Sequence, residues 1–363
     1  MAELAIRAVT LHHGAADFGR LREDLESAAS SLLEAVDRAR SRLGLRPTYV
    51  RVALPGVAAE ELAAVARALE GLPREVMVSV GGAPIREELA GVVVQLASSG
   101  VYVPLLMRER TWAEARAAAR MMIRAASEEP ERATKLAVNA LGAEHFVTPY
   151  FPLASAVPGR EAVSVALTYP TYLLDAYKSG GLDGLRSAAR AAAGRAEEYA
   201  RAVAEEGGYE EAYVDLSVSP WMEDSTLGLV EAVAGVRMPR PGFTMGVRLV
   251  NEAVAEAARG VASAGFNEVM LPLAEDSKLK ARASEGDVTA RYLAMLSGVC
   301  VAGLDMVPVP ADEAGIAGLI LDVASYASAK GRALGARIIP VEGAEPGDKV
   351  DLGRFGEAPV IQI

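Results

Sequence analysis

The sequence holds a single cysteine, Cys300, in 363 residues. One cysteine excludes an internal disulfide framework and fits a reducing cytosol. The first residues lack a basic region followed by an apolar signal core, and no apolar run reaches the ~18 uncharged residues that a membrane span needs. We therefore expect a soluble, cytoplasmic protein with no membrane partner.

Aromatic residues are also scarce, at 5% of the chain, whereas hydrophobic residues make up 51%. The core must therefore be built from Ala, Val, Leu and Ile. The net charge of −11 argues against nucleic acid as a partner, because that binding depends on Lys and Arg neutralising phosphates. An acidic surface mainly favours solubility.

Motifs that would name a reaction are missing. The chain has no Gly-x-Gly-x-x-Gly order, no Walker-type phosphate loop and no Gly-x-Ser-x-Gly turn of a hydrolase. Its histidines lack the spacing of a zinc site. His12 and His13 end the first predicted strand. We keep His145 as a candidate ligand-binding residue, since it follows a predicted strand at 135–141.

Strand-like and helix-like patterns alternate along most of the chain. The predicted strands are 4–10, 49–54, 75–80, 101–107, 135–141, 162–167, 212–218, 268–273, the apolar run through Cys300, 336–341 and 358–363. The predicted helices are 17–43, 60–69, 85–96, 111–126, 182–206, 227–233, 244–264, 288–296 and 313–330. The long helix at 182–206 follows a loop at Gly180-Gly181.

This alternation predicts a parallel α/β architecture with the helices outside. Several strands are apolar almost throughout, as expected when both faces of a sheet are covered. With about ten strands, a closed α/β barrel suits the count better than an open sheet, because closure removes both edges. No Pro-rich or Ser-rich linker interrupts the chain, so we expect residues 1–363 to form a single barrel-like domain.

Cys300 lies in the apolar run 296–310, five residues before a carboxylate at Asp305. As a catalytic residue it would be a thiolate nucleophile or a metal ligand, which requires a nearby cation or helix N-terminus. The alternative, a small buried hydrophobe, is the commoner fate of a free cysteine. No His or Lys lies close in the sequence to activate it.

Carboxylates near the ends of predicted strands are the other candidates, since α/β folds place their sites there. They are Asp215, Asp224, Glu275, Asp276 and Asp305, with Ser225 beside Asp224. Oxygen ligands from several strands could hold Mg²⁺, Ca²⁺ or Mn²⁺, or a pair in a dry cleft could act as acid and base. The structural alternative, favoured for Asp224 and Asp276, is that they cap the helices that follow. Asp215 and Asp305 interrupt apolar strands, which makes a functional role for them harder to dismiss.

The segment 146–152 concentrates aromatic residues in a chain that has few. It could form a lid or the wall of a pocket, or it could be a rigid packed loop. Trp221, just after Pro220, allows the same two interpretations.

Several short segments, most of them in the second half of the chain, match a known protein family in their order and spacing. They are Val214–Ser217, Asp224-Ser225, Leu271–Asp276, Cys300, Gly303–Met306 and Ala358–Val360, with weaker matches at Ile6–Thr10 and around 144–151. In order and spacing they resemble the bacterial and archaeal family called domain of unknown function 711.

That family is similar to the glycyl-radical enzymes, which implies a ten-stranded α/β barrel of the pyruvate formate-lyase-like fold. In those enzymes a cysteine on a loop inside the barrel forms a thiyl radical, and Cys300 is the residue that could take its place. The glycyl-radical motif, Arg-Val-x-Gly-aromatic near the C-terminus, is absent, because Gly353–Gly356 does not match it. The resemblance therefore implies the fold, argues against radical chemistry and implies no activity.

Our first hypothesis is an enzyme that acts on a small polar metabolite. Its catalytic residues would be Asp215, Asp305 and Cys300, and its ligand-binding residues Glu275, Asp276, Asp224, Ser225 and His145, with a divalent cation as one option. One alternative is a non-catalytic metabolite-binding protein on a former glycyl-radical-type fold. Another is an oligomeric scaffold, suggested by the Ala-rich helix at 182–206, and we expect a homo-oligomer.

Overall fold

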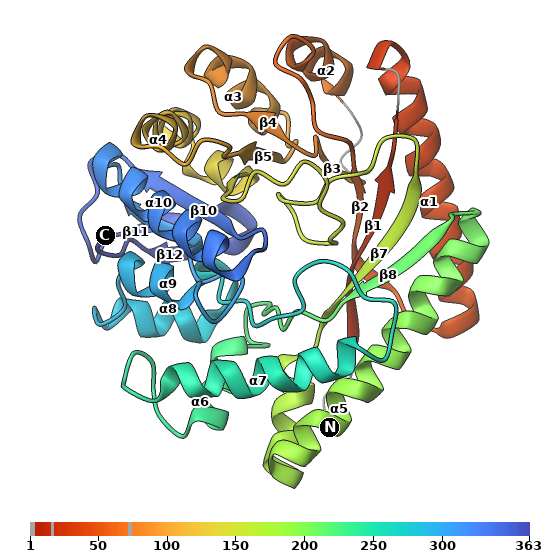
Figure 1. The fold of residues 1–363 in the computed structure, drawn as a ribbon, viewed down its shortest axis with the longest axis vertical. Coiled ribbons are helices and arrows are strands. Elements are labelled where there is room, and N and C mark those ends of the chain that lie inside the picture. Colours follow the sequence, from red (N-terminus) through yellow and green to blue (C-terminus); the bar gives the residue numbers. More distant parts are fainter. Residues whose placement is uncertain (1–3, 16–17, 72–74) are drawn as a thin grey trace.

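A computed structural model describes residues 4–15, 18–71 and 75–363 (Figure 1). The first of its two large sheets has the strand order β3-β2-β1-β7-β8. Its strands are β1 (Ala5–His13), β2 (Pro47–Ala53), β3 (Met77–Ser79), β7 (Glu161–Thr168) and β8 (Glu211–Asp215). Neighbouring strands run parallel except for β1 and β7, which are antiparallel.

The second sheet has the order β4-β5-β6-β10-β9. Its strands are β4 (Ala83–Pro84), β5 (Val103–Leu106), β6 (Leu136–Asn139), β9 (Asp305–Pro310) and β10 (Gly335–Val341), and only β6 and β10 pair antiparallel. A small hairpin follows, made of β11 (Lys349–Asp351) and β12 (Glu357–Pro359). Each large sheet is therefore mixed, which corrects the prediction of parallel strands throughout.

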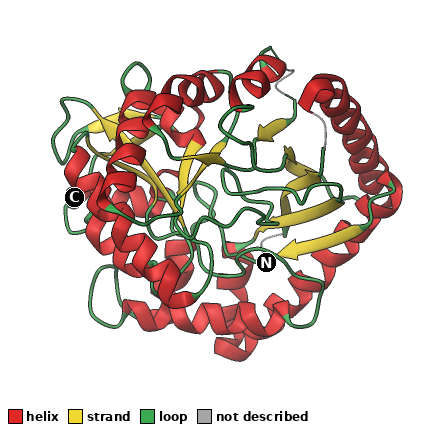
Figure 2. Cartoon of the chain, turned by 45° about the horizontal axis from the view of Figure 1, so that its top comes forward, coloured by secondary structure: helices red, strands yellow, loops and turns green. Residues whose placement is uncertain are grey.

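Helices surround the strands, and loops fill the space between the sheets (Figures 1 and 2). The α-helices are α1 (Leu21–Leu43), α2 (Leu62–Leu69), α3 (Ala90–Ser98), α4 (Trp112–Ala126), α5 (Pro170–Gly207), α6 (Thr226–Ala234), α7 (Phe243–Ala258), α8 (Ser277–Ser284), α9 (Ala290–Leu296) and α10 (Glu313–Lys330). The short 3-10 helices are η1 (Phe18–Arg20), η2 (Glu87–Leu89), η3 (Pro130–Lys135), η4 (Leu273–Glu275) and η5 (Gly353–Phe355).

Helix α1 illustrates why these segments are helical. Leu21, Leu25, Leu32 and Val36 recur along one face and are buried. The helix ends at Gly44, whose φ of 71° is the left-handed conformation that glycine adopts at low cost. The helical spacing read from the sequence is therefore the stripe that covers the first sheet.

Isolated bridges connect the edges of the two sheets. Ser79 pairs with Tyr102 on one side, and on the other Val218 pairs with Val269 and Met270 with Ala302. These are single residue pairs rather than strands. A mixed α/β fold with its helices outside is confirmed, whereas a closed ten-stranded barrel is not shown. The single domain expected for residues 1–363 stays a prediction.

Several predicted elements differ in the structure. The strand expected at 358–363 is only the short β12, and the helix expected at 244–264 ends with α7 at Ala258. The strand expected at 268–273 is an irregular segment held by bridges, and it runs into η4. The strand expected through Cys300 begins only at Asp305, so the cysteine lies in a bend before it. The helix expected at 182–206 begins earlier, as α5, with non-helical backbone at Gly180 and Gly181 where the loop was expected.

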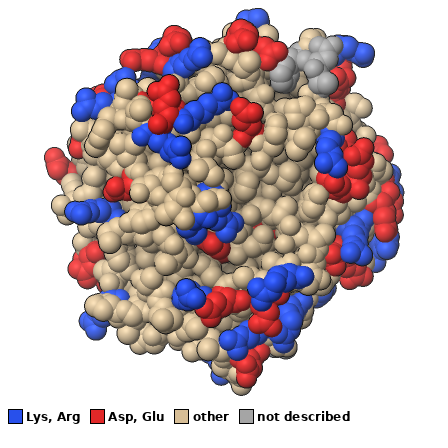
Figure 3. Space-filling view, in the orientation of Figure 1, with Lys and Arg blue, Asp and Glu red and all other residues tan. Residues whose placement is uncertain are grey.

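No helix in the described part of the chain is long and apolar enough to cross a bilayer. On the face shown in Figure 3, Lys and Arg side chains are interspersed with Asp and Glu side chains. The expectation that nucleic acid is not a partner stays a prediction.

Candidate functional site

A cavity with about 690 Å³ of empty space, part of it open to solvent, is lined by residues of both large sheets. Its charged lining residues are Arg7, Arg51, Glu275, Asp305, Arg337 and Arg354. Its aromatic lining residues are Tyr49, Tyr102, Tyr150, Phe151, Trp221, Phe266 and Phe355. So many rings around one cavity, in a chain with 5% aromatics, mark it as the leading candidate site.

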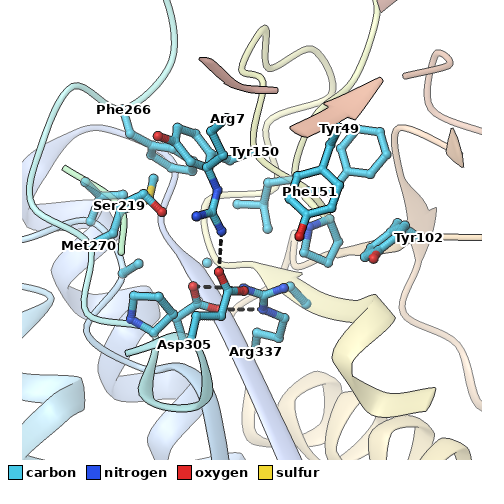
Figure 4. Close-up of a pocket in the computed structure, with 18 of the residues that line it drawn as sticks. Arg7, Tyr49, Tyr102, Tyr150, Phe151, Ser219, Phe266, Met270, Asp305 and Arg337 are labelled. Atoms are coloured by element: carbon cyan, nitrogen blue, oxygen red, sulfur yellow. Dashed lines mark hydrogen bonds and ion pairs between the residues drawn. The ribbon is translucent and has the colours of Figure 1, made fainter. Parts of the chain in front are cut away.

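Two carboxylates and two guanidinium groups form an ion-pair network on one side of the cavity (Figure 4). Glu275 accepts hydrogen bonds from Arg7 Nη2 at 2.5 Å and from Arg337 Nη2 at 3.0 Å. Asp305 accepts from Nε of Arg337 at 2.6 Å and from its Nη2 at 3.1 Å. Arg337 therefore bridges the two carboxylates, and within this network the charges balance.

The same surroundings shift the pKa values of the two carboxyl groups in opposite directions. Burial raises the pKa of Glu275, but the positive charges of Arg7 and Arg337 outweigh burial, so the pKa lies below its ordinary value. Burial also raises the pKa of Asp305, and Arg337 offsets only part of that increase. Asp305 is thus the more easily protonated of the pair.

Arg51, on β2, has no carboxylate that balances its charge. The residue is 6% exposed, and no Asp or Glu of the described residues lies within ion-pair distance of it. Nη1 donates to the carbonyl oxygen of Pro149 at 2.6 Å, whereas the buried Nε has no hydrogen-bond partner. The guanidinium lies 5.2 Å from the ring centre of Tyr49 and 5.0 Å from that of Phe151. Burial lowers the pKa of Arg51 to about 10, which leaves the side chain charged at neutral pH.

Arg354, in η5, is an exposed residue that contacts the ring of Tyr49 as Arg51 does. Its guanidinium lies 5.2 Å from the ring centre of Tyr49 and 4.7 Å from that of Phe355. Nη2 donates to the hydroxyl of Tyr102 at 3.1 Å. No ion pair joins Arg354 to a carboxylate among the described residues, so it is a second cation without an anionic partner.

Irregularities in the sheets aim two of the charged side chains. The pairing of β1 with β7 shifts between Ile6 and Ala8, so Arg7 is the extra residue. The pairing of β10 with β9 shifts so that Met306, next to Asp305, is the extra one. Bulges of this kind re-aim side chains and are enriched beside active sites.

Backbone strain gathers at the same place. Of the described non-glycine residues with positive φ, Met222, Asn267 and Met306 each directly follow a residue that lines the cavity. Their φ angles lie between 51° and 55°, a left-handed conformation that is costly for side-chain-bearing residues. Such strain persists where the surrounding structure holds it, often at functional sites.

Among the residues expected from the sequence, Glu275 and Asp305 are brought together in the cavity through Arg337. Tyr150, Phe151 and Pro152, from the aromatic segment, form part of its wall, as does Trp221. Of the two interpretations of that segment, a pocket wall is the one the structure favours.

Asp215 does not line the cavity but holds two loops that do. It is fully buried, and Oδ2 accepts from Thr148 Oγ1 at 2.9 Å and from the Phe266 amide at 2.8 Å. Oδ1 accepts from the amides of Ser217 and Asn267 and from the hydroxyl of Ser217. The catalytic role considered for Asp215 stays a prediction, and its contacts favour a positioning one.

Helix ends account for three further candidates. Asp276 is the N-cap of α8 and also accepts from the hydroxyl of Ser225 at 2.7 Å. Ser225 is itself the N-cap of α6. Asp224 does not cap the helix that follows it, which corrects that expectation: its Oδ1 accepts from the amide and hydroxyl of Thr171, at the start of α5. The ligand-binding roles considered for these residues stay predictions.

Cys300 and His145 lie apart from the cavity lining. Cys300 is fully buried, and burial raises the pKa of its thiol to about 12, the opposite of what a nucleophile needs. Lys330 Nζ, 3.0 Å away, donates to the backbone oxygen of Cys300 and not to its sulfur. His145 is exposed. The geometry favours the buried-hydrophobe alternative for Cys300, and both proposed roles stay predictions.

The arginines of the cavity are the functional candidates that our sequence analysis missed. Arg7, Arg51 and Arg337 each stand alone in an apolar strand, within IRAV, VRVA and ARII. A charge in an apolar strand is costly unless it is paired or bound, and we applied that argument to the aspartates only. Applied to the arginines as well, it would have marked all three strands.

A cation site is not apparent in the described part of the chain, where no group of three or more His, Cys, Asp or Glu side chains could hold a metal ion. Glu275 and Asp305 are both turned toward arginine. The charges that lack partners in the cavity are positive, so the site favours an anion.

Comparisons with known proteins identify the same family as the sequence segments given above. The family model described as Uncharacterised ACR (DUF711) matches residues 110–353. A UPF0210 protein of Pyrobaculum arsenaticum is 31% identical over 409 residues, covering 99% of this chain and 90% of the relative. Another, from Methanopyrus kandleri, is 37% identical over 170 residues, covering 45% of this chain and 38% of the relative. Among solved structures, the anaerobic ribonucleotide reductase of Thermotoga maritima is similar with a TM-score of 0.44 and 9% identity, over 92% of this chain and 80% of that one.

Proposed function

The chain belongs to the DUF711 family, also named UPF0210, and we propose that it binds a small anionic metabolite in the cavity between its two sheets. The observation that carries the proposal is Arg51, a buried guanidinium with an unbonded Nε and with no carboxylate partner among the residues that the structure describes. An unpaired charge in the interior costs several kcal/mol, roughly, unless something compensates it. A bound carboxylate or phosphate would supply both the negative charge and the missing acceptor.

The aromatic wall supports a ligand with an apolar body. Tyr49, Tyr102 and Phe151 stand on one side of the cavity, and Phe266 and Tyr150 on another (Figure 4). Rings of this kind bury flat or apolar groups and are preferred where a few polar groups fix the orientation. The proposed ligand is therefore an organic anion rather than a bare inorganic ion.

The network of Glu275, Arg337 and Asp305 supports an enzymatic role as a second candidate function. Its two carboxyl groups have their pKa values moved in opposite directions, an arrangement that separates an acid from a base. Asp305 would transfer a proton to or from the bound anion, and Glu275 would stay ionised. This version of the enzyme hypothesis needs no divalent cation, and a non-catalytic binding protein remains the alternative.

The fold that frames the site supports a barrel-like interpretation. The bridges at Ser79, Val218 and Met270 continue the two sheets toward each other on both sides of the cavity. We propose that these bridged segments take the place of short strands in a closed ring of about ten strands. The homo-oligomer expected from the sequence remains a proposal without a structural counterpart.

Binding of organic anions to an Arg51→Gln variant tests the proposed function. We expect benzoate or phenylphosphonate to raise the melting temperature of the wild-type protein, and uncharged benzamide not to. The variant should lose this response, because Gln keeps the hydrogen-bonding capacity but not the charge. Differential scanning fluorimetry across ligand concentrations measures the shift.

The matched control is Arg40→Gln, which removes an arginine whose side chain is 52% exposed and paired with Asp37. It should keep the full response. A wild-type protein that ignores both anions at saturating concentration, or an Arg51→Gln variant that responds as strongly as wild type, would refute anion binding at this site.

A further inference from the structure

We infer that the ligand carries two negative charges, one placed against Arg51 inside the cavity and one against Arg354 at its mouth. This inference rests on the anion binding proposed above and specifies the class of anion. It follows from the distribution of charge around the cavity and from the position of the two unpaired guanidinium groups.

The first step is the balance of the buried charges. Glu275 and Asp305 pair with Arg7 and Arg337, so these four groups neutralise one another. Arg51 is then the one positive charge in excess among the buried groups that line the cavity. A ligand must bring one negative charge to restore neutrality inside.

The second step is the position of Arg354. Its guanidinium and that of Arg51 each lie 5.2 Å from the centre of the same ring, Tyr49. The two cations therefore lie no more than 10.4 Å apart, twice the 5.2 Å distance, so a ligand whose negative charges span the separation could contact both. With nothing bound they repel each other, and the charge of Arg354 is one of the causes that lower the pKa of Arg51.

The third step is the route to solvent. A second hollow, whose empty space of about 1190 Å³ includes open solvent, shares Tyr102, Arg354 and Phe355 with the first cavity. These three residues separate the two cavities, and Arg354 is exposed while Arg51 is buried. The second negative charge of the ligand would therefore lie at this boundary, where Arg354 can meet it without further desolvation.

Two chemical classes supply a second charge on a small apolar body: a phosphate monoester or phosphonate, and a dicarboxylate. Both present oxygens to the planar guanidinium groups in the geometry that arginine prefers. A monoanion of the same shape would satisfy Arg51 and leave Arg354 without a partner.

Matched pairs of probes separate charge from shape. Phenylphosphonate is a dianion at about pH 8, and benzenesulfonate is a monoanion of nearly the same shape. Phthalate and benzoate form the corresponding pair for carboxylates. We expect calorimetric titration to give a dissociation constant about tenfold lower for at least one dianion than for its monoanion partner. A gain for phenylphosphonate alone indicates a phosphate-type ligand, and a gain for phthalate alone indicates a dicarboxylate.

The variant Arg354→Gln should weaken dianions more than monoanions and so remove most of this preference. Arg354→Lys should keep most of the preference, because it retains the charge. Arg51→Gln should weaken monoanions and dianions alike. Arg40→Gln serves as the exposed control for all four probes. Melting temperatures without ligand verify that each variant is folded.

Two results are distinguishable failures. If the wild-type protein binds the monoanion and dianion of each pair equally well, or if Arg354→Gln keeps the preference, the two-charge inference is wrong while anion binding stands. If none of the four probes binds to the wild-type protein, the proposed function itself fails, and this inference fails with it.

Discussion

Asp215 binds loops that line the cavity but is not itself part of the lining. Its carboxylate has no cationic partner within the described ranges, and it accepts hydrogen bonds from five donors in three loops. One of these donors is the amide of Phe266, whose ring lines the cavity. Gly265 makes the approach possible, because a Cβ there would lie 2.2 Å from Oδ2 of Asp215.

We expect Asp215→Asn to lower the free energy of unfolding by about 3 kcal/mol. The NH₂ group of asparagine would face N–H and O–H donors in a buried site, and those donors would lose their acceptor. Chemical denaturation monitored by circular dichroism measures the loss. Asp37→Asn, at a side chain that is 71% exposed, is the control and should change stability by no more than about 0.5 kcal/mol. A stability equal to that of wild type would show that Asp215 does not hold these loops.

Residue chemistry also decided which parts of the site were predictable. Asp305 and Glu275 stood out because carboxylates near strand ends are recognisable in the sequence. Their partnership was not predictable, since Glu275 and Arg7 are 268 residues apart and meet only through the sheet topology. The arginines were predictable by the same reasoning, because Arg7, Arg51 and Arg337 are each a lone charge in an otherwise apolar strand.

At the scale of elements, two helix starts are tied to each other. Ser225 caps α6 by accepting from the amide of Gly228, and its hydroxyl donates to Asp276, the N-cap of α8. The cap of one helix thus orients the cap of the other. Glu275, directly before Asp276, is the anchor of the ion-pair network in the cavity.

We expect Ser225→Ala to lower the free energy of unfolding by about 1 kcal/mol, because α6 loses its cap and Asp276 loses a donor. Ser225→Gly should lower the free energy of unfolding by less than Ser225→Ala does, because glycine at an N-cap costs only about a few tenths of a kcal/mol. The loss of the donor to Asp276 is the same in both variants. Urea denaturation of the two variants makes the comparison. Equal stability of Ser225→Ala and wild type would show that the cap does not contribute to the free energy of unfolding.

Elements with strong periodicity were predicted well and irregular ones were not. The helix expected at 313–330 has the same bounds as α10. The strand expected at 268–273 is apolar enough, but the chain is diverted just before it. Gly265 and Asn267 have positive φ angles, and the amides of Phe266 and Asn267 donate to the carboxylate of Asp215. Such a diversion depends on a residue some fifty positions away, which no local pattern reports.

For the molecule as a whole, acid sensitivity follows from one buried histidine. His12 lies inside the first sheet, with Nδ1 2.8 Å from the carbonyl oxygen of Ser155 and Nε2 2.7 Å from the hydroxyl of Ser164. Burial lowers its pKa from 6.5 to about 4. His12 is therefore part of the core, with both ring nitrogens within hydrogen-bond distance of a partner.

Because the unfolded chain binds the proton more tightly than the folded one, stability is lost as the pH falls from about 6.5 to about 4, and His12 adds no further loss below that. The expected loss from this residue is about 3 kcal/mol. We expect His12→Gln to show a shallower decline over this interval than wild type in urea denaturation. His145→Gln, at an exposed histidine, should reproduce the wild-type profile. Parallel profiles for wild type and His12→Gln would contradict this account.

The cavity draws its walls from both ends of the described chain, from Arg7 on β1 to Phe355 in η5. During synthesis on the ribosome, the last strand of the first sheet, which ends at Asp215, is made well before Arg354 and Phe355. A ligand of the kind we propose, which contacts both Arg51 and Arg354, would therefore meet its complete site only after residue 355 has been added. Binding of such a ligand would then distinguish the chain made through η5 from shorter fragments.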